Sequence, residues 1–208
     1  MNKLWNVLLY PARFYEKLTD NKGTLIAGMI LIGLIDFFLP DLTEVYKTYF
    51  TDFAGKSAAD IQFNIVAAVL IILLLGVVDV AFLSIPLYDI FKFLKKKEGL
   101  PHQASAIKVM KIYIMSHFLI IPVNVILYYT VFHDLGSNSG AGDIILAEAA
   151  FFIILIWSSA IITRGINTLY QFGFFLKRLT FLIVFTWSFL FSMVLDMQIM
   201  NWLLKILR

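Results

Sequence analysis

A long apolar stretch from Ile65 to Ile90 constrains this chain more than any other feature. As an α-helix its 26 residues span about 39 Å, more than the ~30 Å hydrocarbon core of a bilayer. A cluster of lysines follows it: Lys92, Lys95, Lys96 and Lys97. Lys and Arg gather on the cytoplasmic side of membrane proteins. The stretch therefore predicts a membrane span that ends at the cytoplasm.

The composition indicates the membrane class for the whole chain. The 208 residues are 61% hydrophobic and 15% charged, with a mean hydropathy of +0.86, whereas soluble domains have about 25% charged residues. We expect a single integral membrane domain over residues 1–208. Because the chain has no cysteine, disulfides, thiolate metal sites and a cysteine nucleophile are excluded.

Five apolar segments are candidates for membrane spans, at about 24–39, 65–90, 112–132, 144–170 and 179–204. The first is marginal in length and ends at Pro40, where the residue before proline disfavours helix. More than twenty mixed residues precede it, so we expect no cleavable signal peptide. The predicted fold is all-α: a polytopic membrane helix bundle with five transmembrane helices and short interfacial amphipathic helices.

Two segments have the pattern of interfacial helices. Residues 1–22 place apolar side chains such as Trp5 and Leu8 at helical spacing, and Pro11 can begin a second short turn. Basic residues alternate with them, which is typical of a segment in the headgroup plane near anionic lipid. A helix packed under the bundle explains the same pattern. Residues 41–60 repeat it with balanced charge, and we expect them on the opposite membrane face.

The distribution of Lys and Arg predicts the orientation. With the amino terminus inside, twelve lie on the cytoplasmic side and four outside, while Arg164 is in the membrane. The inside set is Lys3, Arg13, Lys17, Lys22, Lys92, Lys95, Lys96, Lys97, Lys108, Lys111, Lys177 and Arg178. This positive-inside bias predicts a cytoplasmic amino terminus and, with five spans, a carboxy terminus outside.

Polar residues recur on one face of several spans. Tyr113, His117, Asn124 and Tyr128 share a helical face, as do Arg164, Asn167, Thr168 and Gln171. Charged groups in hydrocarbon cost about 2.5–3.5 kcal/mol, so they should turn inward and find partners. We identify as a candidate intramembrane site Asp79, Asp89, His117, Asn124, Arg164, Asn167 and Gln171. The group is explained either as polar glue between helices or as a transport or ligand site.

Depth in the membrane suggests which charges meet. Counted from the cytoplasmic ends, Asp79 lies about 18 Å deep, His117 about 13 Å and Arg164 about 10 Å. Arg164 has a long side chain, so we expect it to pair with Asp79. Asp89, close to the cytoplasmic surface, is the alternative partner.

No motif of an enzyme is present: the chain has no HExxH, no GxSxG and no phosphate-binding loop. We expect no enzymatic activity, no cofactor and no metal. We expect Lys92, Lys95, Lys96 and Lys97 to form a lipid-facing basic cluster. Anionic lipid alone explains the basic face, so nucleic acid is not expected as a partner.

The chain resembles the Yip1 family of five-span membrane proteins. The similar stretches are YPARFYEKLTD before the first span, EGLPHQASAIKVMKIYIMSHFLIIP into the third, and WSSAIITRGINTLYQFG with KRLTFLIVFTW in the fourth and fifth. The short amino-terminal region is similar to that of prokaryotic members. The resemblance implies a five-span fold in the plasma membrane.

Three functions fit these observations. The first is a non-enzymatic protein that organises the membrane through lipid and partner-protein contacts, with anionic lipid on the cytoplasmic side. The second is a transporter or permeation path for a small solute or lipid along the polar faces, for which a homodimer would restore the symmetry that five spans lack. The third is an intramembrane enzyme in which Asp and His act as acid and base.

Overall fold

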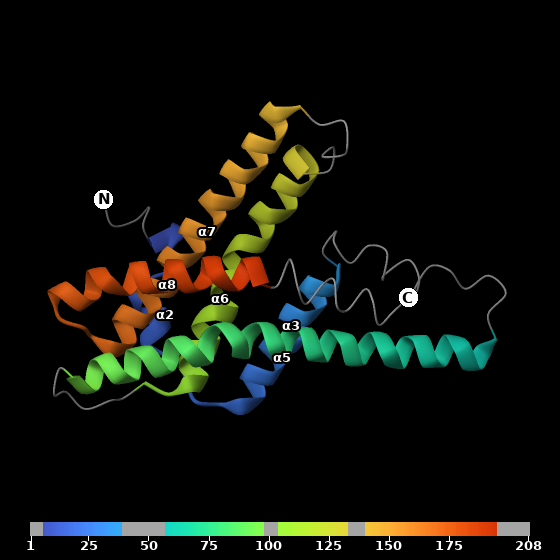
Figure 1. Cartoon of the computed structure of the whole chain (residues 1–208). Helices are drawn as coiled ribbons and strands as arrows, with labels where there is room; N and C mark the ends of the chain where they lie inside the picture. The colour runs from blue at the N-terminus through green and yellow to red at the C-terminus, as the bar shows by residue number, and fades with distance from the viewer. Residues whose placement is uncertain (1–5, 39–56, 98–103, 133–139, 195–208) are drawn as a thin grey trace.

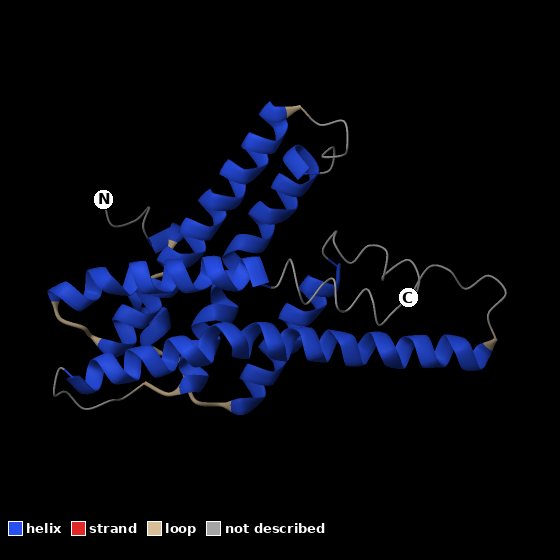
Figure 2. Cartoon of the chain, viewed as in Figure 1, coloured by secondary structure: helices blue, strands red, loops and turns tan. Residues whose placement is uncertain are grey.

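The computed structural model describes residues 6–38, 57–97, 104–132 and 140–194. Its elements are α2 (Ala12–Glu16), α3 (Lys22–Phe38), α5 (Ala58–Lys97), α6 (Ala106–Leu127), the π-helical η3 (Tyr128–Phe132), α7 (Ala141–Tyr170) and α8 (Phe174–Val194). Every one of these elements is helical (Figure 2). The predicted all-α fold is confirmed for the described residues.

In the described part of the chain, four helices are long and apolar enough to cross a membrane: α5, α6 with the start of η3, α7 and α8. Large apolar side chains face outward along them, including Phe63, Leu70 and Ile153 with 71%, 60% and 65% of their surface exposed. Such exposure fits contact with lipid rather than water. The described part of α3 has 17 residues and is about 26 Å long, shorter than the ~30 Å core. A fifth span therefore stays a prediction.

Helix α5 is the longest element and extends beyond its predicted span. Its 40 residues reach about 60 Å, twice the thickness of the hydrocarbon core. Ser57 and Asp60 cap its start: the Ser57 hydroxyl donates to Asp60 at 2.6 Å, and the Asp60 N–H donates back to the Ser57 hydroxyl at 3.3 Å. Residues 57–60 of the predicted second interfacial helix therefore belong to the beginning of α5; residues 41–56 lie outside the described part of the chain.

Two glycines bring α3 and α5 into backbone contact. A Cβ on Gly33 would lie 1.9 Å from the Ile72 carbonyl oxygen, and a Cβ on Gly76 would lie 1.9 Å from the Met29 carbonyl oxygen. No other residue can occupy either position while the helices stay this close. Small residues at a helix crossing are the usual means of tight packing in membranes, where apolar burial alone gives no preference for protein over lipid.

Figure 1 shows α6 and α7 running side by side, with α5 and α8 crossing them. Leu87, Ile112, Ile162 and Val184 come from these four helices and are almost completely buried in one core. The Trp187 indole N–H donates to the Leu83 carbonyl at 3.0 Å and joins α8 to α5. The core therefore lies where the two pairs of helices cross.

The amino-terminal segment packs against α7. Tyr15 of α2 is fully buried, and its hydroxyl donates to the carbonyls of Leu9 and Ile161 at 2.9 and 3.3 Å. Burial raises the pKa of the Tyr15 phenol, so the group stays protonated and can donate. The Trp157 indole N–H donates to the Leu8 carbonyl at 2.7 Å. Of the two explanations offered for this segment, packing on the bundle is observed.

Candidate functional site

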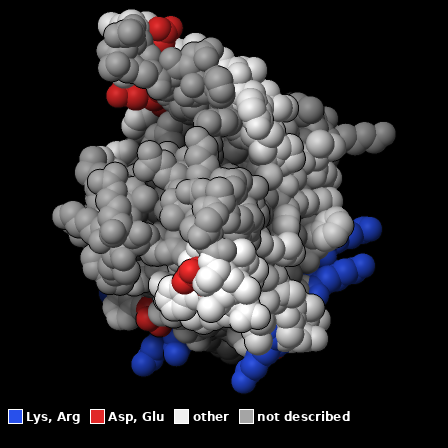
Figure 3. Space-filling model, turned by 90° about the vertical axis from the view of Figure 1, so that its right-hand side faces the viewer, with Lys and Arg blue, Asp and Glu red and all other residues white. Residues whose placement is uncertain are grey.

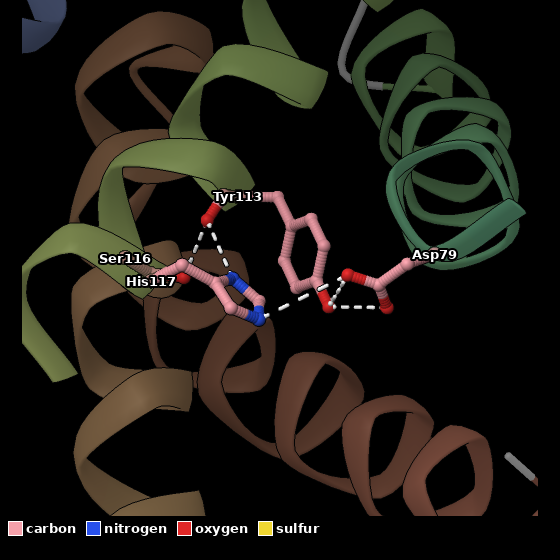
Figure 4. A network of polar contacts seen from close by, with 4 residues as sticks. All are labelled: Asp79, Tyr113, Ser116 and His117. Carbon is pink, nitrogen blue, oxygen red and sulfur yellow. Dashed lines mark hydrogen bonds and ion pairs between the residues drawn. The ribbon is translucent and has the colours of Figure 1, made fainter. Parts of the chain in front are cut away.

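A polar network joins α5 to α6 inside the bundle (Figure 4). Asp79, in the middle of α5, is 6% exposed. The Tyr113 hydroxyl lies 2.8 and 2.9 Å from the two Asp79 carboxylate oxygens and donates its proton to them. Ser116 donates to the Tyr113 carbonyl at 2.7 Å. A buried carboxylate needs such donors, because no water replaces them in an apolar core.

His117 completes the network one helical turn after Tyr113. The two rings stack edge to face with centroids 4.4 Å apart. His117 Nδ1 lies 3.3 Å from the Tyr113 carbonyl oxygen, and Nε2 lies 3.9 Å from an Asp79 oxygen. A carbonyl oxygen only accepts, so the hydrogen bond requires a proton on Nδ1. Nε2 is then the ring nitrogen that faces the Asp79 carboxyl group inside the bundle.

Asp36 brings a second carboxylate from α3. It interacts electrostatically with Asp79 and with Tyr113. Asp36 was not among the candidate site residues that the sequence predicted. The described network therefore combines two acidic groups with a tyrosine and a histidine.

The expected ion pair between Asp79 and Arg164 is wrong. Among the described residues Asp79 pairs with His117, whereas Arg164 donates to the Asn6 side chain at 2.7 Å. The physical reason is the docking of the amino-terminal segment on α7, where Tyr15 hydrogen-bonds the Ile161 carbonyl. That docking brings Asn6 within reach of Arg164, while Asp79 points toward α6.

The other predicted site residues lie apart from the network. Asp89 is exposed on α5. Asn124 is half-buried on α6, and its Oδ1 finds no hydrogen-bond partner in the described part of the chain. Asn167 donates to the Lys177 carbonyl at 3.0 Å. Gln171 ends α7 in a left-handed conformation with φ 48°. Of the seven residues that the sequence grouped into one site, the structure brings together Asp79 and His117.

The predicted basic cluster divides into exposed and buried lysines. Lys92, Lys96 and Lys97 are exposed. Lys95 is 5% exposed, donates to the Gln171 carbonyl at 3.3 Å and lies 5.7 Å from the Phe172 ring centroid. Its inclusion among lipid-facing residues is wrong, because it lies on the buried face of α5 and ties that helix to the end of α7.

The sequence missed three members of the network, Asp36 among them. Tyr113 was placed on the polar face of the third span but not in the site, and Ser116 was not considered. The four-residue spacing of Tyr113 and His117 was the available signal, because residues i and i+4 of a helix are neighbours. No group of three or more His, Asp or Glu residues able to hold a metal occurs in the described ranges.

The sequence matches no family model, no curated protein and no solved structure.

Proposed function

We propose that this chain is a five-span, non-enzymatic membrane protein of the Yip1 type. It would lie in the plasma membrane with a cytoplasmic amino terminus and an outer carboxy terminus. It would organise the bilayer through anionic lipid and partner-protein contacts at its cytoplasmic face, with membrane proteins or a second copy as partners.

The observation that carries the proposal is the clustering of positive charge at one end of the bundle. The contact of Lys95 with Gln171 joins the end of α5 to the junction of α7 and α8. Lys111 donates to the Thr19 carbonyl at 2.7 Å, which joins the start of α6 to the amino-terminal segment. We call this the basic end; it includes Lys17, Lys22, Lys92, Lys95, Lys96, Lys97, Lys108, Lys111, Lys177 and Arg178. The face drawn in Figure 3 has basic side chains along the lower part and the right edge, and acidic ones both at the top and in the lower half.

Aromatic rings beneath the cations support a position at the membrane surface. Lys97 lies 4.7 Å from the Phe93 ring centroid, and the guanidinium carbon of Arg178 lies 4.1 Å from that of Phe174. Such side chains bury their apolar parts in the interface and hold their charge at the headgroups. Each Lys or Arg near an anionic leaflet contributes about 1 kcal/mol.

Two single cysteines in this cysteine-free chain test the proposal. Lys96→Cys and Ser139→Cys variants, reconstituted in vesicles, are each labelled with a donor fluorophore. Energy transfer to labelled phosphatidylglycerol should exceed transfer to labelled phosphatidylcholine from position 96 but not from position 139. In intact cells, an impermeant thiol reagent should reach only position 139. Equal transfer to both lipids at position 96 would contradict the lipid contact, and labelling of both positions would contradict the orientation.

The network at Asp79 favours a second candidate, a proton-linked transporter or permeation path. The Asp79 carboxyl group lies 3.9 Å from His117 Nε2 inside the bundle, an arrangement that suits the uptake of one proton. Vesicles containing the protein and a pH-sensitive dye should then dissipate an imposed pH gradient. Asp79→Asn should abolish that flux, and Asp89→Asn, an exposed matched control, should retain it. Absence of flux above that of empty vesicles would exclude this candidate.

A further inference from the structure

A groove of about 360 Å³ runs between α3 and α6 and begins at the amino-terminal segment. On α3 it is lined by Thr24, Ala27, Gly28 and Leu31. These positions follow the i, i+3, i+4, i+7 pattern of one helical face. Ala27 is exposed and Leu31 is 44% exposed, so this wall is accessible from the membrane.

Helix α6 supplies the other wall with the same spacing: Lys111, Ile114, Met115 and Phe118. Phe118 is 41% exposed, whereas Ile114 is buried. A Cβ added to Gly28 would lie 2.8 Å from the Ile114 side chain. Gly28 and Ile114 therefore form the floor of the groove.

The groove is polar at one end and apolar along the rest. Thr24 and Lys111 lie near the beginnings of α3 and α6, which both start at the basic end. Leu31 and Phe118 lie seven residues further along, about 11 Å deeper. One leaflet contributes about 15 Å to the hydrocarbon core. The groove thus covers most of the depth of the leaflet on the basic side.

Two lysine ammonium groups, those of Lys17 and Lys111, line the polar end of the groove. Lys17 is exposed at the end of α2. Lys111 is 7% exposed, and the Thr19 carbonyl holds its Nζ at 2.7 Å. An ammonium group has three donors, of which Thr19 takes one. The neighbouring carboxylate of Asp20 accepts from Ser105, lies 3.9 Å from Lys108 and also interacts electrostatically with Lys111.

We propose that this groove binds one anionic glycerophospholipid of the cytoplasmic leaflet. The headgroup phosphate meets Lys17 and Lys111, and one acyl chain follows the stripe from Ala27 to Phe118. The inference rests on the proposed function, since it needs the basic end at an anionic leaflet. It goes further by assigning a defined site in place of a diffuse attraction.

Charge and shape together select this ligand. A soluble anion would gain nothing from the apolar walls, and a zwitterionic lipid would bring its own cation to the two lysines. A partner helix is a cylinder about 10 Å wide, whereas Gly28 and Ile114 are in contact at the floor of the groove and leave no gap of that width between α3 and α6.

Native mass spectrometry in detergent tests the inference by titration with phosphatidylglycerol and phosphatidylcholine of identical chains. Lys17→Gln should weaken saturable phosphatidylglycerol binding about fivefold, because one lysine contributes about 1 kcal/mol and 1.4 kcal/mol is tenfold. Ala27→Phe should fill the groove and abolish the saturable binding. Two matched controls lie outside the groove. Ala149→Phe on the exposed surface of α7 should bind as the wild type does, and Lys96→Gln at the basic end should weaken only the non-saturable association with phosphatidylglycerol.

The outcomes separate this inference from the proposed function. Selective binding by the wild type that Lys17→Gln and Ala27→Phe leave intact would overturn the groove and keep the basic end. Equal affinity of the wild type for both lipids would overturn both. All four positions are exposed, so the variants should fold, and their unfolding without added lipid checks this.

Discussion

Replacing Gly33 or Gly76 with alanine should separate α3 from α5. The new Cβ would lie 1.9 Å from a backbone carbonyl oxygen of the facing helix, Ile72 or Met29. Ordinary contact begins near 3.4 Å, so the helices must move apart by about 1.5 Å. A side chain could rotate away, but a backbone carbonyl within a helix cannot. We expect a loss near the upper end of the usual range for overpacking, about 3 kcal/mol for each variant.

Unfolding by SDS titration from a mild detergent, followed by circular dichroism, measures the effect. Gly142→Ala is the matched control, because nothing lies within 4 Å of its added Cβ; alanine there should be neutral or slightly stabilising. The double variant Gly33→Ala with Gly76→Ala should lose much less than the sum, since one separation relieves both clashes. If Gly33→Ala unfolds at the same SDS fraction as Gly142→Ala, the close crossing does not exist.

Further predictions concern the polar contacts, measured by the same titration. Tyr113→Phe should cost about 1.5–3 kcal/mol, because a buried carboxylate loses its donor; an unchanged stability would place Asp79 in water. Tyr15→Phe should lower the stability by about 1 kcal/mol and speed proteolysis of the amino-terminal segment, because the hydroxyl's hydrogen bonds are lost. Tyr10→Phe is the control, because the Tyr10 hydroxyl makes no hydrogen bond with the described residues. Asp79→Asn and Arg164→Met should be additive, since the two side chains contact different partners; a coupling above about 0.5 kcal/mol would restore the ion pair.

Hydropathy predicted most of the helical segments because long apolar runs have few other solutions in a membrane. The predicted span 144–170 and α7, Ala141–Tyr170, end at the same residue. Helix α5 was underestimated because hydropathy detects only the apolar part of a helix. The signal for its true start was present in Ser57 and Asp60, whose spacing is that of a capping box.

Helix rotation was the information that the sequence did not supply. Depth alone allowed Arg164 to meet Asp79, but the faces of α5 and α7 that carry them turn to different neighbours. For Lys95 a signal existed. Leu87, Phe91 and Lys95 recur at four-residue intervals along the buried face of α5, so periodicity distinguishes Lys95 from the exposed Lys96. Grouping lysines by their position in the sequence concealed that difference.

The glycine crossing and the polar network belong to one junction. Asp36 follows Gly33 by three residues, and Asp79 follows Gly76 by three, so each carboxylate lies about one turn beyond a crossing glycine on its helix. Asp36 interacts electrostatically with Asp79 across this crossing, and α6 contributes Tyr113 and His117 to the same junction. A contact selected only to hold helices together would gain more from opposite charges. The hydrogen bonds from Tyr113 to Asp79 and the 3.9 Å contact of Asp79 with His117 Nε2 are the geometric basis for keeping the proton-linked alternative beside the lipid-organising function.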